Sequence, residues 1–301
     1  MTAETEIAEN EKAVADLLDL MDLEVLEHNL YRGVSPDERW QRVFGGQVIG
    51  QALVAASRTV DDDRPCHSLH CYFLRPGDPK IPIIYEVDRI RDGRSFTTRR
   101  VVAIQHGKAI FSLAASFQVP EDGPEHDVAP PEYPGPEGLI NEREHRAKLA
   151  DKLPEHIKTD FLRPRPIETR QVDPKDFINP QPREPKQAVW VRAAAPLPDD
   201  SPIALHQCLL GYASDMMLLD TCVQPHGLSW FKGEVQTASL DHAMWFQRPF
   251  RADEWLLYVM DSPSSGGARG LNRGTFYDVE GRVVASVAQE GLVRIDDGRS
   301  K

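Results

Sequence analysis

The stretch GGQVIGQALVAASRTV, residues 45–60, has the apolar spacing of a buried helix, and segments with strand character follow it. These segments are SLHCYFLRP (68–76), DGRSFTTRRVVAIQ (92–105) and GKAIFSLAASFQV (107–119). One apolar helix followed by several long strands indicates a helix wrapped by an antiparallel sheet. The first part of the chain therefore predicts an α+β fold.

The same order of elements occurs again in the second part of the chain. ALHQCLLGYASDMMLLDT (204–221) precedes SLDHAMWFQRP (239–249), GARGLNRGTFYDV (267–279) and GRVVASVAQEGLV (281–293). Pro76 to Gly107 spans 31 residues and Pro249 to Gly281 spans 32, so the spacing of the two copies agrees. We predict a duplicated fold, although two unrelated helix-then-strand segments would give a similar pattern by chance.

The pattern also predicts how the chain is divided. Residues 120–140 are rich in proline and acid, and a second proline cluster covers 163–186, with a short helix expected near 142–153. The predicted organisation is an acidic N-terminal segment (1–22), a first repeat (23–119), a proline-rich linker region (120–186) and a second repeat (187–296).

Composition excludes several classes of protein. The 301 residues are 41% hydrophobic and 27% charged, as in a globular protein, and no run approaches the length of a membrane span. The net charge of −12 argues against binding of nucleic acid, which usually requires a basic face. The acidic N-terminus is unlike a secretory or transit signal, so we expect a cytoplasmic protein whose four cysteines are reduced.

Comparison of the two repeats points to an acid and an amide. Counted from Gly50 and Gly211, Asp215 takes the place of Val54, and Gln289 falls opposite Ala115 in the last strand. The second repeat therefore puts Asp215 and Gln289 on faces that the first repeat keeps apolar. Because the helix face and the strand face should meet in the core, the two side chains could share a water molecule.

A carboxylate held by an uncharged donor can deprotonate a water molecule, which is a general-base arrangement. Ser239, on the strand that follows the helix, offers a hydroxyl group to the same place. The structural alternative is that Asp215 pairs with an arginine from the other half or turns towards solvent. His242 is a weaker candidate for the base, since a histidine beside Trp245 can simply pack or form a structural hydrogen bond.

Other chemistries have less support. No G-x-S-x-G elbow, P-loop or G-x-G-x-x-G motif occurs, so we expect neither an α/β serine hydrolase nor a protein that binds nucleoside triphosphates or dinucleotides. His67 and His70 lack a third metal ligand nearby, so we interpret them as structural residues. The glycine-rich stretch SSGGARGLNRG (264–274) carries Arg269 and Arg273, which are either ordinary surface residues or contacts for substrate phosphates.

Six blocks of the sequence resemble the acyl-CoA thioesterase II family, whose fold is a double hotdog, with two helix-wrapped antiparallel sheets in one chain. The blocks, in order, are FGGQVIGQAL (44–53), SLHCYFLRPGD (68–78), YASD (212–215), LDHAMWFQRPF (240–250), EWLLYVMDSPSSGGARGLNRGTFYD (254–278) and GRVVASVAQEGLVR (281–294). The resemblance covers almost the whole chain from about residue 23 to residue 295.

The resemblance implies hydrolysis of fatty acyl-CoA to free fatty acid and coenzyme A without a cofactor, in a homodimer or higher homo-oligomer. The catalytic trio of that family falls on Asp215, Ser239 and Gln289, of which the repeat comparison selects the first and the last independently. Serine stands at 239 where the family often has threonine. The alternatives are a hotdog enoyl-CoA hydratase, for which DFINPQP (176–182) lacks the required histidine, and a non-enzymatic acyl-CoA-binding module.

Overall fold

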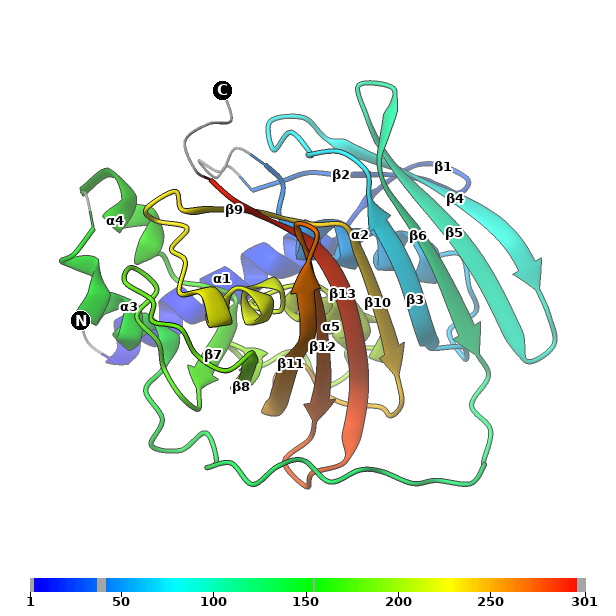
Figure 1. The fold of residues 1–301 in the computed structure, drawn as a ribbon. Coiled ribbons are helices and arrows are strands. Elements are labelled where there is room, and N and C mark those ends of the chain that lie inside the picture. Colours follow the sequence, from blue (N-terminus) through cyan, green and yellow to red (C-terminus); the bar gives the residue numbers. More distant parts are fainter. Residues whose placement is uncertain (1–2, 37–41, 154, 297–301) are drawn as a thin grey trace.

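The computed structural model describes residues 3–36, 42–153 and 155–296, and Figure 1 shows how they are arranged. The strands are β1 (Glu24–Glu27), β2 (Leu30–Gly33), β3 (Cys66–Phe73), β4 (Ile83–Asp92), β5 (Phe96–Gln105), β6 (Lys108–Gln118), β7 (Ile167–Gln171), β8 (Lys186–Ala193), β9 (Val235–Ser239), β10 (Asp241–Phe246), β11 (Leu256–Gly266), β12 (Arg269–Tyr277) and β13 (Val283–Ile295). The helices are α1 (Ala3–Met21), α2 (Gly45–Ser57), α3 (Glu142–Ala150), α4 (Glu155–Phe161) and α5 (Ile203–Ser214), followed by 3₁₀ turns at Leu219–Cys222 and Gln224–His226.

Within these ranges the strands form one 13-stranded antiparallel sheet in the order β1-β2-β4-β5-β6-β3-β10-β13-β12-β11-β8-β7, with β9 paired to β13. The order β2-β4-β5-β6-β3 in the first half corresponds to β8-β11-β12-β13-β10 in the second. The halves join where β3 pairs with β10, and Leu69 lies opposite Met244 at this seam. The duplicated α+β fold predicted from the sequence is confirmed.

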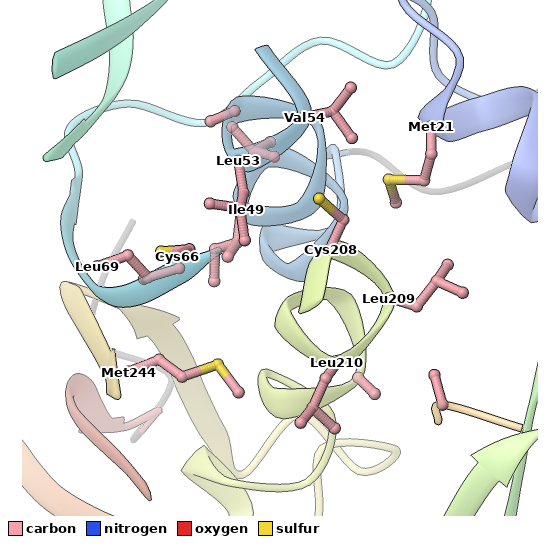
Figure 2. Packing of buried hydrophobic residues seen from close by; sticks show 14 of the residues in the cluster. Met21, Ile49, Leu53, Val54, Cys66, Leu69, Cys208, Leu209, Leu210 and Met244 are labelled. Carbon is pink, nitrogen blue, oxygen red and sulfur yellow. The ribbon is translucent and has the colours of Figure 1, made fainter. Parts of the chain in front are cut away.

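The central helices of the two halves pack against each other, and Figure 2 shows α2 with Ile49 and Leu53 beside α5 with Cys208. A Cβ atom on Gly46 would lie 2.2 Å from the carbonyl oxygen of Tyr212, and one on Gly50 would lie 3.2 Å from that of Cys208. The residue numbers increase along α2 while those of the contacting residues in α5 decrease, so the two helices are antiparallel. Their backbones are in close contact. The N-terminus of α2 therefore lies beside the C-terminus of α5.

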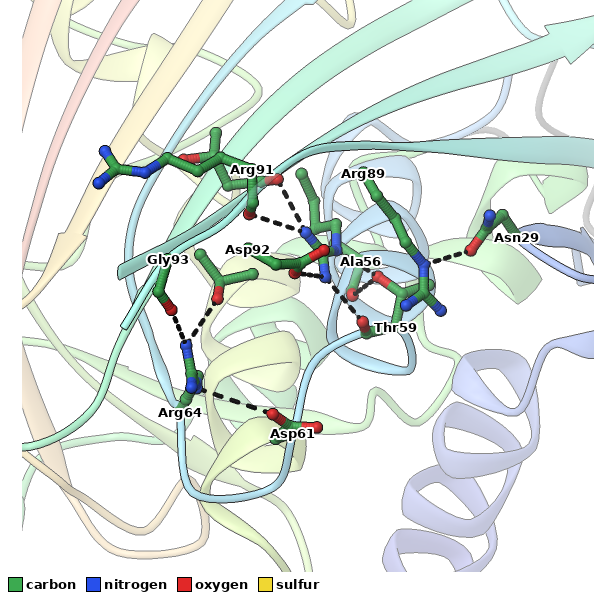
Figure 3. A network of polar contacts seen from close by, with 12 residues as sticks. Asn29, Ala56, Thr59, Asp61, Arg64, Arg89, Arg91, Asp92 and Gly93 are labelled. Carbon is green, nitrogen blue, oxygen red and sulfur yellow. Dashed lines mark hydrogen bonds and ion pairs between the residues drawn. The ribbon is translucent and has the colours of Figure 1, made fainter. Parts of the chain in front are cut away.

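A buried arginine connects the other end of α2 to the strands of the first half. Arg99 on β5 is 1% exposed, donates to the hydroxyl and carbonyl oxygens of Thr59 at 2.8 and 3.0 Å, and pairs with Asp92. Figure 3 shows this polar network at the end of β4. A buried guanidinium with its donors occupied fixes the helix relative to the sheet.

The segments outside the two repeats lie against this body. The acidic N-terminal segment is mostly the helix α1, which buries Val14 and Leu17 in the core. After β6 the chain has no helix or strand until α3, runs along the outside of the second half (Figure 1), and is held by ion pairs from Arg248 to Asp127 and Glu125. No helix in the described part of the chain is long and apolar enough to cross a membrane.

Candidate active site

Three polar side chains from separate elements meet beside the end of α5. Gln289 Nε2 on β13 donates to Oδ1 of Asp215 at 3.1 Å and to Oγ of Ser239 at 2.6 Å. Ser239, the last residue of β9, donates to the same Oδ1 at 3.3 Å. Gln289 is fully buried, whereas Asp215 and Ser239 are half-buried. The structure thus brings together the three residues that the sequence analysis selects.

Helix α5 is shorter than the sequence pattern predicts. The predicted helix covers 204–221, but α5 ends at Ser214, and Asp215 is its C-cap. The 3₁₀ turns that follow also repeat every three residues, so their apolar residues prolong the helical pattern in the sequence. Met217 lies between α5 and the first 3₁₀ turn, and its backbone is left-handed (φ 64°). Gln187 Nε2 donates to the carbonyl oxygen of Met217 at 2.8 Å. Asp215 therefore lies at a helix end rather than in the middle of a helix.

A buried histidine orients the amide of Gln289. His242 Nδ1 lies 3.0 Å from Oε1 of Gln289, and its Nε2 lies 2.9 Å from Oγ of Ser214. Burial lowers the pKa of His242 below its usual value, so the ring is neutral near pH 7. An amide oxygen only accepts, so Nδ1 carries the proton and donates it. The amide nitrogen of Gln289 is thereby left to face Asp215 and Ser239.

These contacts match the structural hydrogen bond that the sequence analysis gives as the alternative to a base role for His242. Both ring nitrogens are used inside the protein, which argues against a general-base role. The signal was present in the repeat: counted from Pro76 and Pro249, the place of His242 is taken by Leu69 in the first half. A histidine in place of a buried leucine marks a polar site in the same way as Gln289 does.

The matching place in the first half is apolar. The counterparts of Asp215, His242 and Gln289 there are Val54, Leu69 and Ala115. Leu69 and Ala115 lie opposite each other on β3 and β6, and all three are buried. One half of the duplicated fold therefore has the polar cluster, and the matching place in the other half is filled by apolar side chains.

The N-terminus of α2 reaches across from the first half to Asp215. A Cβ atom on Gly45, the first residue of α2, would lie 2.5 Å from Oδ2 of Asp215. The preceding residue, Phe44, makes no side-chain capping hydrogen bond. The first N–H groups of a helix have no partner within the helix and carry a partial positive charge, which favours negative charge beside them.

A cavity of about 410 Å³ opens beside this cluster. Asp215 contributes to its lining, and the apolar part of its wall includes Phe44 and Tyr212, whose rings meet edge to face, together with Met216 and the buried Ile167. The volume falls within the usual range for small-molecule sites, which are mostly apolar with few polar groups. Both halves contribute to the wall, because Phe44 precedes α2 and Tyr212 belongs to α5.

The structure does not bring Arg269 and Arg273 to this cavity. In β12 they alternate with buried residues and face outward, whereas Asn272 is the residue opposite Gln289. Arg273 pairs with Asp261 at 2.5 Å, and Arg269 Nε lies 2.9 Å from Glu290. Strand alternation puts both arginines on the face opposite to Gln289, so they do not line this cavity, and their contact with substrate stays a prediction.

Two other features bear on alternative chemistry. In the described ranges no three His, Cys, Asp or Glu side chains are grouped as metal ligands would be. The segment DFINPQP forms a loop in which Asp176 accepts from the N–H groups of Ile178 and Asn179 at 2.9 and 3.0 Å. Asp176 lines a second, smaller cavity rather than the one that contains Asp215.

The chain is similar to proteins of known class along most of its length. Residues 161–292 match a family model described as acyl-CoA thioesterase, and residues 36–118 match one described as acyl-CoA thioesterase N-terminal domain. Acyl-coenzyme A thioesterase 8 from Mus musculus is 44% identical over 290 residues, which cover 92% of this chain and 88% of that protein.

Solved structures agree with the fold. An acyl-CoA thioesterase II from Mycobacterium marinum is 46% identical, with a TM-score of 0.75 over 93% of this chain and 98% of that one. A hotdog-fold protein of unknown function from Alicyclobacillus acidocaldarius is 16% identical, with a TM-score of 0.73 over 92% of this chain and 97% of that one, which shows likeness of fold alone. The architecture is therefore the double hotdog.

Proposed function

This chain belongs to the acyl-CoA thioesterase family, and from that premise we propose that it hydrolyses fatty acyl-CoA to free fatty acid and coenzyme A with Asp215, Ser239 and Gln289 as its catalytic residues. The observation that carries the proposal is the convergence of the three side chains, which are joined by hydrogen bonds of 2.6 to 3.3 Å beside the cavity that Asp215 lines.

Asp215 acts as the general base. It takes a proton from a water molecule held between its carboxylate and the Ser239 hydroxyl group, and the hydroxide so formed attacks the thioester carbonyl carbon. Gln289 donates to the carboxylate and the hydroxyl group, which keeps both in position, and His242 holds the amide in the orientation this requires. No covalent acyl-enzyme forms.

The N-terminus of α2 stabilises the oxygen that becomes negative. Its first N–H groups lie next to Asp215, as the close approach of Gly45 shows, and one such donor contributes roughly 3 to 4 kcal/mol in comparable sites. When the tetrahedral intermediate collapses, the carbon–sulfur bond breaks and the thiolate of coenzyme A leaves. The proton held by Asp215 returns to solvent or to the thiolate.

The apolar wall of the cavity is where the acyl chain lies. Because it is built from Phe44, Tyr212, Met216 and Ile167, a longer chain buries more apolar surface, at about 0.8 kcal/mol per methylene group. We therefore expect medium-chain or long-chain acyl-CoAs to be preferred over acetyl-CoA. Equal kcat/KM for acetyl-CoA and palmitoyl-CoA would contradict this assignment.

The test is thiol release from acyl-CoAs of increasing length by the wild type and by Asp215→Asn. The variant keeps the shape and an acceptor oxygen for Ser239 and Gln289 but lacks the base, so kcat should fall about 10² to 10⁴-fold with an unchanged melting temperature. All four cysteines are buried, and burial raises the pKa of Cys208 to about 12. The thiol reagent therefore detects the released coenzyme A rather than the thiols of the protein. Near wild-type kcat in the variant would remove Asp215 from the mechanism.

Assembly belongs to the same proposal. We propose a homodimer or higher homo-oligomer. The sheet ends in β1, whose four residues are all exposed, and such an edge favours pairing or cover by another chain. Light scattering coupled to gel filtration tests the assembly, and a monomer at micromolar concentration would contradict it.

A further inference from the structure

Three arginines stand around the cavity that contains Asp215. Arg42 belongs to the segment before α2, whereas Arg163 and Arg165 follow α4, so two distant stretches of the chain supply them. Arg42 and Arg163 are exposed, and the Arg165 side chain is 38% exposed. The deeper lining, including Gln47 and Ile167, is buried. The guanidinium groups are therefore at the rim, and the catalytic cluster lies further in.

Carboxylates also line the cavity, and their contacts decide what the arginines can bind. Glu142 is only 13% exposed, and it accepts from Thr169 Oγ1 at 2.9 Å while Arg146 Nε and Arg165 Nη1 lie 3.6 and 3.3 Å from its Oε1. Its oxygens are thus engaged inside the protein. The remaining acids of the lining are Asp160, at the end of α4, and Asp215 of the catalytic cluster.

An arginine rim is notable in a chain with a net charge of −12, because the overall field repels an anionic substrate. Guanidinium groups bind phosphate oxygens through two parallel N–H···O bonds, which gives orientation as well as attraction. A substrate that enters this cavity acyl end first leaves its other end at the rim.

We propose that Arg42, Arg163 and Arg165 form the site for the phosphate groups of the coenzyme A part of the substrate. The site sets the enzyme's preference for thioesters of coenzyme A over thioesters of small thiols. This inference rests on the proposed function, and it replaces the assignment of the phosphate contact to Arg269 and Arg273. Coenzyme A is held at the rim, and its pantetheine arm carries the thioester inward to Asp215.

Two substrates with the same acyl group separate this site from the catalytic cluster. One is octanoyl-CoA and the other is the octanoyl thioester of N-acetylcysteamine, which has no phosphate. Arg42→Ala and Arg163→Ala should each raise KM for octanoyl-CoA about 10-fold, equivalent to about 1.4 kcal/mol, and leave kcat/KM for the small thioester unchanged. Because the rim is exposed to solvent, higher salt should raise KM for octanoyl-CoA in the wild type and much less in the variants.

Arg100→Ala is the matched control. Arg100 on β5 is 56% exposed, pairs with Asp88 and does not line the cavity, so the variant makes the same charge change elsewhere on the surface. Its KM for both substrates should equal that of the wild type. Arg42→Lys keeps the positive charge but loses the planar guanidinium group that donates two parallel hydrogen bonds. Its KM for octanoyl-CoA should therefore lie between those of the wild type and Arg42→Ala.

Binding of coenzyme A itself, measured by calorimetry, makes the test independent of hydrolysis. The dissociation constant should rise about 10-fold in Arg42→Ala, in step with KM. An unchanged constant would overturn the proposal, as would equal losses on the two thioesters or a larger effect from Arg273→Ala. Failure of the proposed function has a different signature, because the wild type would then bind coenzyme A through the arginines but hydrolyse neither thioester.

Discussion

Replacing Gly45 by alanine should impair catalysis through a carboxylate that belongs to the other half of the molecule. The added Cβ atom would lie 2.5 Å from Oδ2 of Asp215, whereas ordinary contacts begin near 3.4 Å. The carboxylate must therefore retreat by about 0.9 Å, because the ring of Phe73, 3.0 Å from the same Cβ position, closes the space on that side. A displacement of about 1 Å costs on the order of 10²-fold in rate.

We therefore expect kcat for octanoyl-CoA to fall about 100-fold, equivalent to about 2.7 kcal/mol of transition-state stabilisation. The melting temperature should stay near that of the wild type, since alanine is a better helix former than glycine by roughly 0.5 to 1 kcal/mol and offsets part of the strain. The assay is thiol release with purified protein, and circular dichroism reports the fold.

The helix glycine Gly211 provides the control, since a Cβ atom there would meet only Cγ2 of Ile49, at 3.3 Å. Gly211→Ala should keep kcat within about threefold of the wild type, as for a tolerated packing change. In the Asp215→Asn background, Gly45→Ala should cost far less than it does alone, because both changes act on one group. A Gly45→Ala enzyme with wild-type kcat and an intact fold would refute the assigned position of the base.

The remaining predictions concern the groups around Gln289. His242→Leu, which copies Leu69 of the first half, should lower kcat about 10-fold at unchanged KM, the worth of one net hydrogen bond to the amide, and equal kcat would exclude a positioning role. Ser239→Thr should stay within about threefold of wild-type kcat, whereas Ser239→Ala should lose about 10-fold, since only the hydroxyl group is needed. Burial lowers the pKa of His242 in the folded protein, so only the unfolded chain takes up that proton just below pH 6.5. The free energy of unfolding should therefore decline as the pH falls below 6.5, and urea titrations should show a shallower decline in His242→Leu.

The duplicated fold could be predicted because its signal is periodic and repeated. Apolar residues recur at helix and strand spacing twice, and Asp215 and Gln289 were visible as polar residues where the other copy has Val54 and Ala115. The helix end at Ser214 was not visible, because the 3₁₀ turns beyond it continue the same spacing.

Features that depend on register could not be predicted. Alternation along β12 shows that Arg273 and Asn272 face opposite sides, but only the pairing of Asn272 with Gln289 shows which side holds the site. The rim arginines posed the same difficulty, because Arg42 and Arg163 are brought together by packing between distant segments. No local pattern in the sequence indicates which distant segments contact each other.

The seam between β3 and β10, together with the packing of α2 on α5, has a consequence for how the protein unfolds. One hydrophobic cluster includes Val14, Ile49, Leu210 and Val287, and so extends through both copies. Separating the copies would expose that cluster and break the main-chain ladder between them, so neither copy can melt while the other stays folded. Calorimetry should record a single cooperative transition whose van't Hoff and calorimetric enthalpies agree. The chain was built from two units of sequence, yet in thermodynamic terms it is one.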